Sequence, residues 1–160
     1  MPSLSFVVAG LLLVVLLCAL YGVFLGYPPP RFSAKVLNTK EQAVAAACAI
    51  TLFPARDPMP LDGIEAGIVE YLDLHLSELP RDKRFQVRLL LAFIEHSPWL
   101  FHVRRRFTAL SPEKRLEILT RMSMSRIYFR RLCFLSLRTL CCMAYFSNPI
   151  IAARVGCTPS

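Results

Sequence analysis

Residues 38–54 read NTKEQAVAAACAITLFP, and this stretch decides the fold class of the chain. Thr39 lies three residues before Gln42, the spacing of a capping box at a helix start. The alanine-rich run from Ala43 to Phe53 follows it without glycine or proline, and Pro54 cannot continue a helix. The stretch therefore predicts a first helix that begins near Thr39 and ends before Pro54.

The rest of the domain shows similar signals for helix starts and helix ends. Asp62 is a candidate cap for a helix that extends to about Leu79, and the apolar residues of this helix recur every three or four positions. Further helices are expected between Asp82 and Ser97 and after the cap residue Ser111. A last long helix, expected to form the core, extends from about Ser125 to Phe146, where Asn148-Pro149 closes it. No sustained two-residue alternation occurs, so the sequence predicts an all-α bundle of about five helices.

The amino-terminal segment predicts a different environment. Residues 4–27 contain no charged side chain and would form a helix of about 36 Å, enough to cross a hydrocarbon core of roughly 30 Å. The alternatives are a buried core helix, which should show a polar stripe, and a cleaved signal peptide, which should begin with basic residues. We therefore expect a single transmembrane helix with a proline stop over residues 1–30, a juxtamembrane linker over 31–38 and a helical domain over 39–157.

The expected orientation follows from charges beside this segment. Arg31, Lys35 and Lys40 lie on its carboxyl-terminal side, whereas no lysine or arginine precedes it. The positive-inside rule then places the bulk of the chain in the cytoplasm. The scattered spacing of the six cysteines is consistent with reduced thiols rather than with a secreted disulfide framework. The sequence thus predicts a single-pass membrane protein with a cytoplasmic domain.

Positive charge is concentrated in the second part of the chain. Residues 1–100 contain 8 basic and 9 acidic side chains, whereas residues 101–160 contain 11 and 2. Two arginine clusters are candidate interaction sites, and their members are Arg104, Arg105, Arg106, Arg126, Arg130 and Arg131. Anionic lipid headgroups of a bilayer and an acidic protein surface both suit such residues, as does solvent alone. Nucleic acid is not expected, because no recognition motif accompanies the charge.

No catalytic constellation is evident in the sequence. His75, His96 and His102 match no zinc-binding pattern, and HExxH, CxxC and CxxCH are absent. The scattered glycines form neither GxGxxG nor a Walker sequence. The neighbouring residues Cys141 and Cys142 are interpreted as packing residues. We therefore assign no catalytic, cofactor-binding or metal-binding residue, and expect no cofactor in this chain.

Several landmarks in order resemble the family of small subunits named after gluconate 2-dehydrogenase subunit 3. The similarity covers roughly residues 40–157. The residues that carry it are Phe53-Pro54-Ala55, Ile68, Tyr71, Leu72, Leu79-Pro80, Phe107, Leu110-Ser111-Pro112-Glu113-Lys114-Arg115, Leu119, Tyr145-Phe146, Asn148-Pro149 and Gly156.

The resemblance implies a non-catalytic accessory subunit of a flavoprotein oxidoreductase of the glucose-methanol-choline type. FAD and the chemistry would then belong to the large partner subunit, which this chain would dock at the membrane or stabilise. Family members are often exported through a twin-arginine signal, which leaves a periplasmic location open. The alternative hypothesis is a stand-alone membrane adaptor or assembly protein that uses its basic helical surface and has no oxidoreductase partner.

Overall fold

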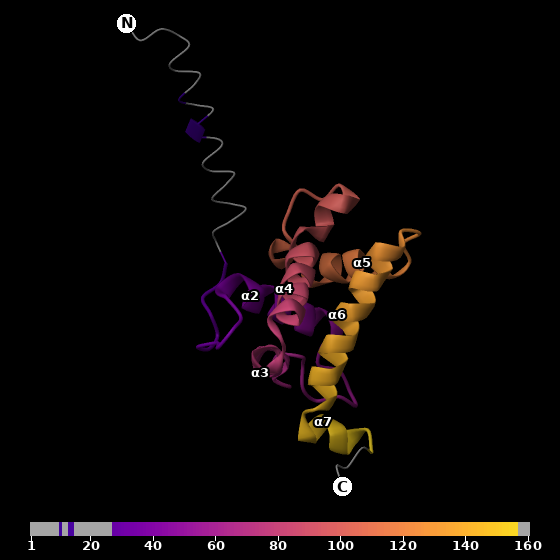
Figure 1. The fold of residues 1–160 in the computed structure, drawn as a ribbon. Helices are drawn as coiled ribbons and strands as arrows, with labels where there is room; N and C mark the ends of the chain where they lie inside the picture. The colour runs from indigo at the N-terminus through magenta and orange to yellow at the C-terminus, as the bar shows by residue number, and fades with distance from the viewer. Residues whose placement is uncertain (1–9, 11–12, 15–26, 157–160) are drawn as a thin grey trace, which may run out of the picture.

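The computed structural model of the chain describes Gly10, Leu13, Val14 and residues 27–156. Within residues 27–156, six α-helices and two short 3-10 helices follow one another (Figure 1). Their bounds are α2 Thr39–Leu52, α3 Ile68–Glu78, α4 Arg81–His96, η1 Ser97–Phe101, η2 Phe107–Ala109, α5 Pro112–Ser123, α6 Tyr128–Phe146 and α7 Pro149–Arg154. The all-helical prediction is confirmed, with one more helix than expected in this part of the chain.

The predicted transmembrane helix is not supported and has to be corrected. Among the described residues, no helix is long and apolar enough to cross a bilayer. A span needs about 20 predominantly apolar residues in one helix, and α6, the longest of the described helices at 19 residues, contains three arginines. Of the segment behind the prediction, only Gly10, Leu13, Val14 and Tyr27 are described, so the rest of residues 4–27 lies outside the described part.

Helix α2 lies at the centre of the bundle. It packs against α3, α4, α5 and α6, and eight of its 14 residues are buried. Its alanines allow this, because small side chains let neighbouring helices approach the α2 backbone closely. The last long helix, α6, contributes one face to the core, with five of its 19 residues buried. The most completely buried helix is therefore α2 and not the expected α6.

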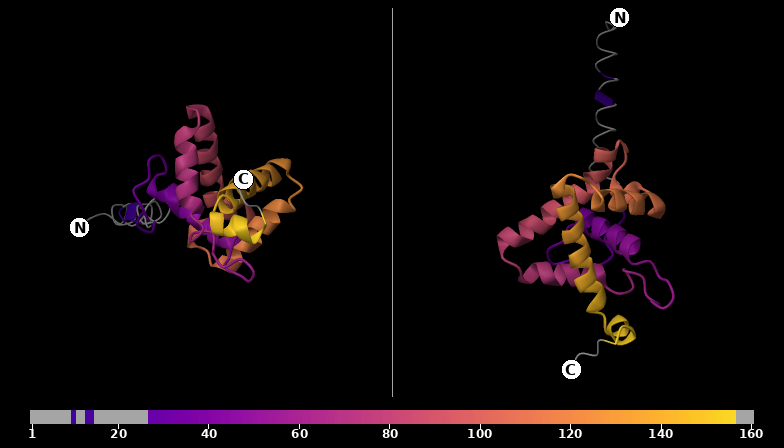
Figure 2. Two further views of the ribbon diagram at one scale, coloured as in Figure 1. Left: turned by 90° about the horizontal axis from the view of Figure 1, so that it is seen from below. Right: turned by 90° about the vertical axis from the view of Figure 1, so that its right-hand side faces the viewer.

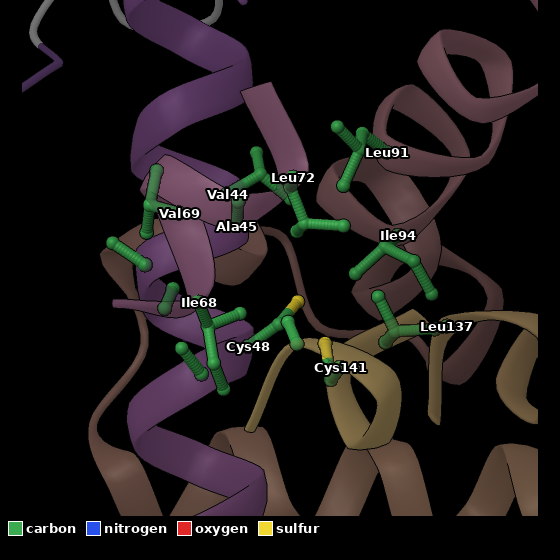
Figure 3. Close-up of a cluster of buried hydrophobic side chains, with 14 of the residues drawn as sticks. Val44, Ala45, Cys48, Ile68, Val69, Leu72, Leu91, Ile94, Leu137 and Cys141 are labelled. Atoms are coloured by element: carbon green, nitrogen blue, oxygen red, sulfur yellow. The ribbon is translucent and has the colours of Figure 1, made fainter. Parts of the chain in front are cut away.

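Apolar side chains from all six described α-helices form the core. Figure 3 shows Val44, Ala45 and Cys48 of α2 beside residues of α3, α4 and α6. Ile68 and Ile94, from α3 and α4, are fully buried there. Since these residues come from separate parts of the chain, the core joins the helices into one domain.

Two helix boundaries differ from the expected ones for local reasons. Asp62 does cap a turn, accepting hydrogen bonds from the N–H groups of Ile64 and Glu65 at 2.7 and 2.8 Å. That turn ends at Gly67, whose φ of +80° is left-handed, and α3 begins only at Ile68. Asn148 does end the long helix, but its side chain also accepts a hydrogen bond from Ile150 N–H and starts α7, which lies at the end of α6 (Figure 2).

The segment before α2 is attached to the domain. Asp73 of α3 accepts hydrogen bonds from the backbone N–H groups of Lys35, Val36 and Leu37 at 2.7, 2.9 and 2.9 Å. Leu37 is buried in the core. The part of the chain expected to be a juxtamembrane linker is thus held by a buried carboxylate, which fixes the direction from which the chain enters α2.

Candidate functional site

The first predicted arginine cluster divides between the surface and the interior. Arg104 and Arg105 are exposed in the segment between η1 and η2. Arg106 instead lies over the ring of Tyr27, with its guanidinium carbon 4.4 Å from the ring centroid. Its Nε is 4.0 Å from Oε1 of Glu95. The structure therefore leaves two arginines of this cluster for a partner and uses the third inside the domain.

Glu95 is the centre of that interior arrangement. Its side chain is buried and accepts hydrogen bonds from Tyr27 Oη at 3.0 Å and from Thr108 Oγ1 at 2.7 Å. The backbone N–H of Thr108 donates to the other carboxylate oxygen at 3.1 Å. Burial, together with the negative charge of Glu95, raises the pKa of Tyr27 against the opposing effect of Arg106. This group of polar residues connects α4, η2 and the amino-terminal segment.

One arginine of the second predicted cluster, Arg130, lies over an aromatic ring that the sequence did not single out. Phe101, at the end of η1, lies beneath the guanidinium of Arg130 of α6 at 5.2 Å and of Arg121 of α5 at 5.4 Å. Arg126 is exposed in the segment between these helices, whereas Arg131 donates a hydrogen bond to Ser125 O at 2.6 Å. Phe101 lies three residues before Arg104 of the first cluster, and its ring contacts Arg130 of the second cluster.

The sequence did not predict Arg121 and Phe101 as site residues, because their contact exists only in the folded chain. Arg121 stands alone in the sequence, and Phe101 resembles any apolar residue of a core face. A guanidinium over an aromatic ring is a favourable contact, and Arg121 also pairs with Glu117 at 3.7 Å. We call Arg104, Arg105, Arg121, Arg126 and Arg130, together with Phe101, the arginine surface. Such a surface is suited to an acidic protein partner.

A second surface feature is an apolar groove between α4 and α6. It has a volume of about 780 Å³, and nine of its twelve lining residues are apolar. Phe93 of α4 and Phe129 of α6 meet edge-to-face in it, with ring centroids 5.2 Å apart. We call this cavity the α4–α6 groove. The sequence predicted that the last long helix forms the core, and no local pattern indicated an exposed groove between this helix and α4.

The histidines do not assemble into a site. His75 stacks on Tyr71 at 5.9 Å between centroids, and His96 meets Trp99 edge-on at 6.2 Å. His102 is exposed and adopts a left-handed φ of +63° at the end of η1. Among the described residues, no group of three metal-ligating side chains comes together. Each of the first two rings thus packs on an aromatic neighbour.

The buried cysteines are poor nucleophiles. Burial raises the pKa of Cys141 to about 12, with a smaller contribution from Cys142, and burial also raises the pKa of Cys48. Both thiols lie in the core cluster of Figure 3. Because the thiolate is the reactive form, these groups are unreactive near neutral pH. The structure thus places Cys141 as a packing residue.

The geometry is that of a small all-helical protein whose exposed features, arginines and an apolar groove, are typical of surfaces that bind other proteins. The sequence model of the family described as gluconate 2-dehydrogenase subunit 3 matches residues 39–157, and the chain belongs to this family. The family takes its name from one subunit of a dehydrogenase complex, which implies an oxidoreductase partner. No curated protein and no solved structure matches the chain.

Proposed function

We propose that this chain is the non-catalytic subunit that binds and stabilises a large FAD-dependent oxidoreductase subunit of the glucose-methanol-choline type. The observation that carries the proposal is the family membership over residues 39–157. A cofactor in another subunit is compatible with this family. In this arrangement FAD and the reaction belong to the partner, and this chain supplies a binding surface.

The arginine surface supports the proposal by its charge. Arg104, Arg105 and Arg126 are exposed, and the segment from residue 101 onward contains 11 basic and 2 acidic residues. Charges at the rim of an interface mainly accelerate association and select the partner. We therefore place the docking of an acidic face of the flavoprotein at this surface.

Affinity purification of the full chain from cells that produce it tests the proposal. The eluate is analysed by mass spectrometry and by an absorbance scan for flavin. A large FAD protein recovered in stoichiometric amount, with flavin absorbance, is the expected result. A colourless chain without an oxidoreductase overturns the proposal and favours the stand-alone adaptor or assembly protein.

Charge reversal tests where the flavoprotein docks. The double variant Arg104→Glu/Arg126→Glu should lower its recovery at least ten-fold, because both side chains are exposed and form no part of the core. The matched control is Arg56→Glu/Arg154→Glu, which changes the same number of exposed charges near another pocket of the domain. Equal recovery with both double variants would move the docking site away from the arginine surface.

A further inference from the structure

The walls of the α4–α6 groove are exposed apolar side chains that no other described part of the chain covers. Leu89 of α4 is 53% exposed, and Phe129 and Leu135 of α6 are 56% and 54% exposed. All three line the groove. Figure 2 shows the two helices diverging from their contact in a V. Exposed apolar side chains that gather along one groove are typical of a site that binds a partner.

The dimensions of the groove indicate what kind of segment it accommodates. On α4 its lining extends from Gln86 to Phe93, about 10 Å at 1.5 Å per residue, and on α6 from Phe129 to Leu140, about 16 Å. These lengths correspond to two to three turns of a third helix. An extended strand is less suitable, because the side-chain walls provide few partners for its backbone N–H and C=O groups, whereas a helix satisfies its own.

The charges beside the groove indicate the polarity of the occupant. Helix α6 contains Arg130, Arg131 and Arg138 and no acidic residue. Exposed Arg138 precedes the lining residue Thr139, and exposed Lys83 lies one turn before the lining residue Gln86. Of the two acidic residues of α4, Glu95 is buried and bonded inside the domain, whereas Asp82 is exposed beside Lys83. The lining of the groove is therefore mostly apolar, and the exposed charges of α4 and α6 beside it are mostly basic.

We infer that the α4–α6 groove binds two to three turns of an amphipathic helix with an apolar face and acidic flanking residues, contributed by the partner subunit. This inference rests on the proposed function and adds to it the chemistry of the contacting segment. The apolar face covers leucines and phenylalanines of both walls, and the acidic flanks pair with Lys83 and Arg138. Helix-in-groove binding of this kind uses anchors at helical spacing.

Two synthetic peptides serve as probes. Both have the same leucine face over three turns and a hydrocarbon staple that keeps them helical, and they differ only in flanking residues, glutamates in one and lysines in the other. Fluorescence anisotropy with the full chain measures their affinities. The glutamate peptide should bind at least ten-fold more tightly than the lysine peptide. Absent binding of both, or equal affinity, overturns the inference.

Variants connect this binding to the groove. Leu135→Glu should lower the affinity for the glutamate peptide at least ten-fold. Leu116 is an exposed leucine of α5 outside the groove, and Leu116→Glu should leave this affinity unchanged. Arg138→Glu should reduce the ratio between the affinities for the glutamate and lysine peptides. It should not disturb the core, because the Arg138 side chain is exposed. Circular dichroism verifies the helix content of each variant. Equal weakening by Leu116→Glu contradicts a site in the groove.

Other occupants give different results in the same set of variants. If the chain forms concentration-dependent dimers and Leu135→Glu abolishes them, the occupant of the groove is a second copy of the chain and not a partner helix. If the chain binds anionic vesicles and Leu135→Glu abolishes this binding, the occupant is lipid. Flavoprotein recovered equally by wild type and Leu135→Glu overturns the groove inference and leaves the proposed function intact. Peptide binding with no flavoprotein recovered by the wild type overturns the proposed function.

Discussion

Asp73 is one residue whose contacts determine how the chain enters the bundle. It is 4% exposed, and its two carboxylate oxygens accept three backbone hydrogen bonds from residues 35–37. Burial by itself raises the pKa of this carboxyl, but the hydrogen bonds from Leu37, Lys35 and Val36 outweigh burial and lower it. The ionised form of Asp73 is therefore the form that the folded chain stabilises.

Asp73→Asn should lower the free energy of unfolding by about 2 kcal/mol at neutral pH, because the amide cannot accept all three bonds. The folded-state pKa of Asp73 lies below its unfolded value of about 3.9, so its contribution is complete above that pH. It is lost as the pH falls through the folded-state pKa. Denaturant unfolding at several pH values should show wild type and variant converging in acid. Exposed Asp57→Asn is the control, and a pH-independent difference for Asp73→Asn would contradict this account.

At the scale of the element, the start of α2 shows how a cap is chosen. The capping box is formed by Asn38 and Glu41, whose side chains each accept the other's backbone N–H at 2.9 Å. Thr39 and Gln42, which the sequence suggested, are one residue further along. Gln42 instead donates to Leu37 O at 3.3 Å and is buried. Two overlapping cap patterns were present, and burial of Gln42 favours the earlier one.

Asn38→Ala should therefore destabilise the domain by about 1 kcal/mol, the usual cost of a lost helix cap. Thr39→Ala should change the free energy of unfolding by less than about 0.5 kcal/mol, since Thr39 is exposed in the first turn and alanine is a good helix former. Thermal and denaturant unfolding of the two variants compares them directly. A larger loss of stability for Thr39→Ala than for Asn38→Ala would indicate that Thr39 is the cap, as the sequence predicted.

At the scale of the whole molecule, contacts between distant segments position the end of the chain. Tyr145 of α6 donates a hydrogen bond to Leu61 O at 2.9 Å, 84 residues earlier, and stacks on Phe53 at 4.3 Å. Asn148 donates to Ala66 O at 3.1 Å. These bonds join the end of α6 to the loop and turn between α2 and α3. The carboxyl-terminal helices are therefore part of the bundle.

Tyr145→Phe should lower the free energy of unfolding by about 1 kcal/mol, because it retains the stacked ring and leaves Leu61 O without this donor. Tyr128→Phe is a matched control, since Tyr128 is 68% exposed at the start of the same helix. Urea unfolding of both variants measures the difference. Equal stability of Tyr145→Phe and wild type would show that the hydrogen bond contributes nothing beyond the ring packing.

Much of the fold could be predicted because its signals are local. Pro54 and Pro80 follow helix ends, Ser111 caps α5 by accepting from Lys114 N–H, and the three- to four-residue period identifies the apolar face of α3. Each depends on a few neighbouring residues and on backbone geometry that tertiary structure seldom changes. The order of these landmarks also identified the family, which the match over residues 39–157 confirms.

The binding surfaces could be predicted only in part. Sequence identified the arginines, but Arg106 contacts Tyr27, 79 positions earlier, and Arg130 contacts Phe101 across two helices. Distances of this kind depend on how the chain folds back, and no local pattern encodes them. The α4–α6 groove has the same origin, because periodicity shows that a helix face is apolar but not whether another helix covers it.

By itself the sequence determined the all-helical class, most helix ends, the family and the residues able to carry positive charge, because composition, capping and proline chemistry act within a few residues. The tertiary structure alone decided that α2 is the central helix, that Arg106 belongs to the interior and that the apolar faces of α4 and α6 diverge into a groove. These features depend on packing between segments far apart in the chain, where side-chain volume and burial determine which surfaces meet.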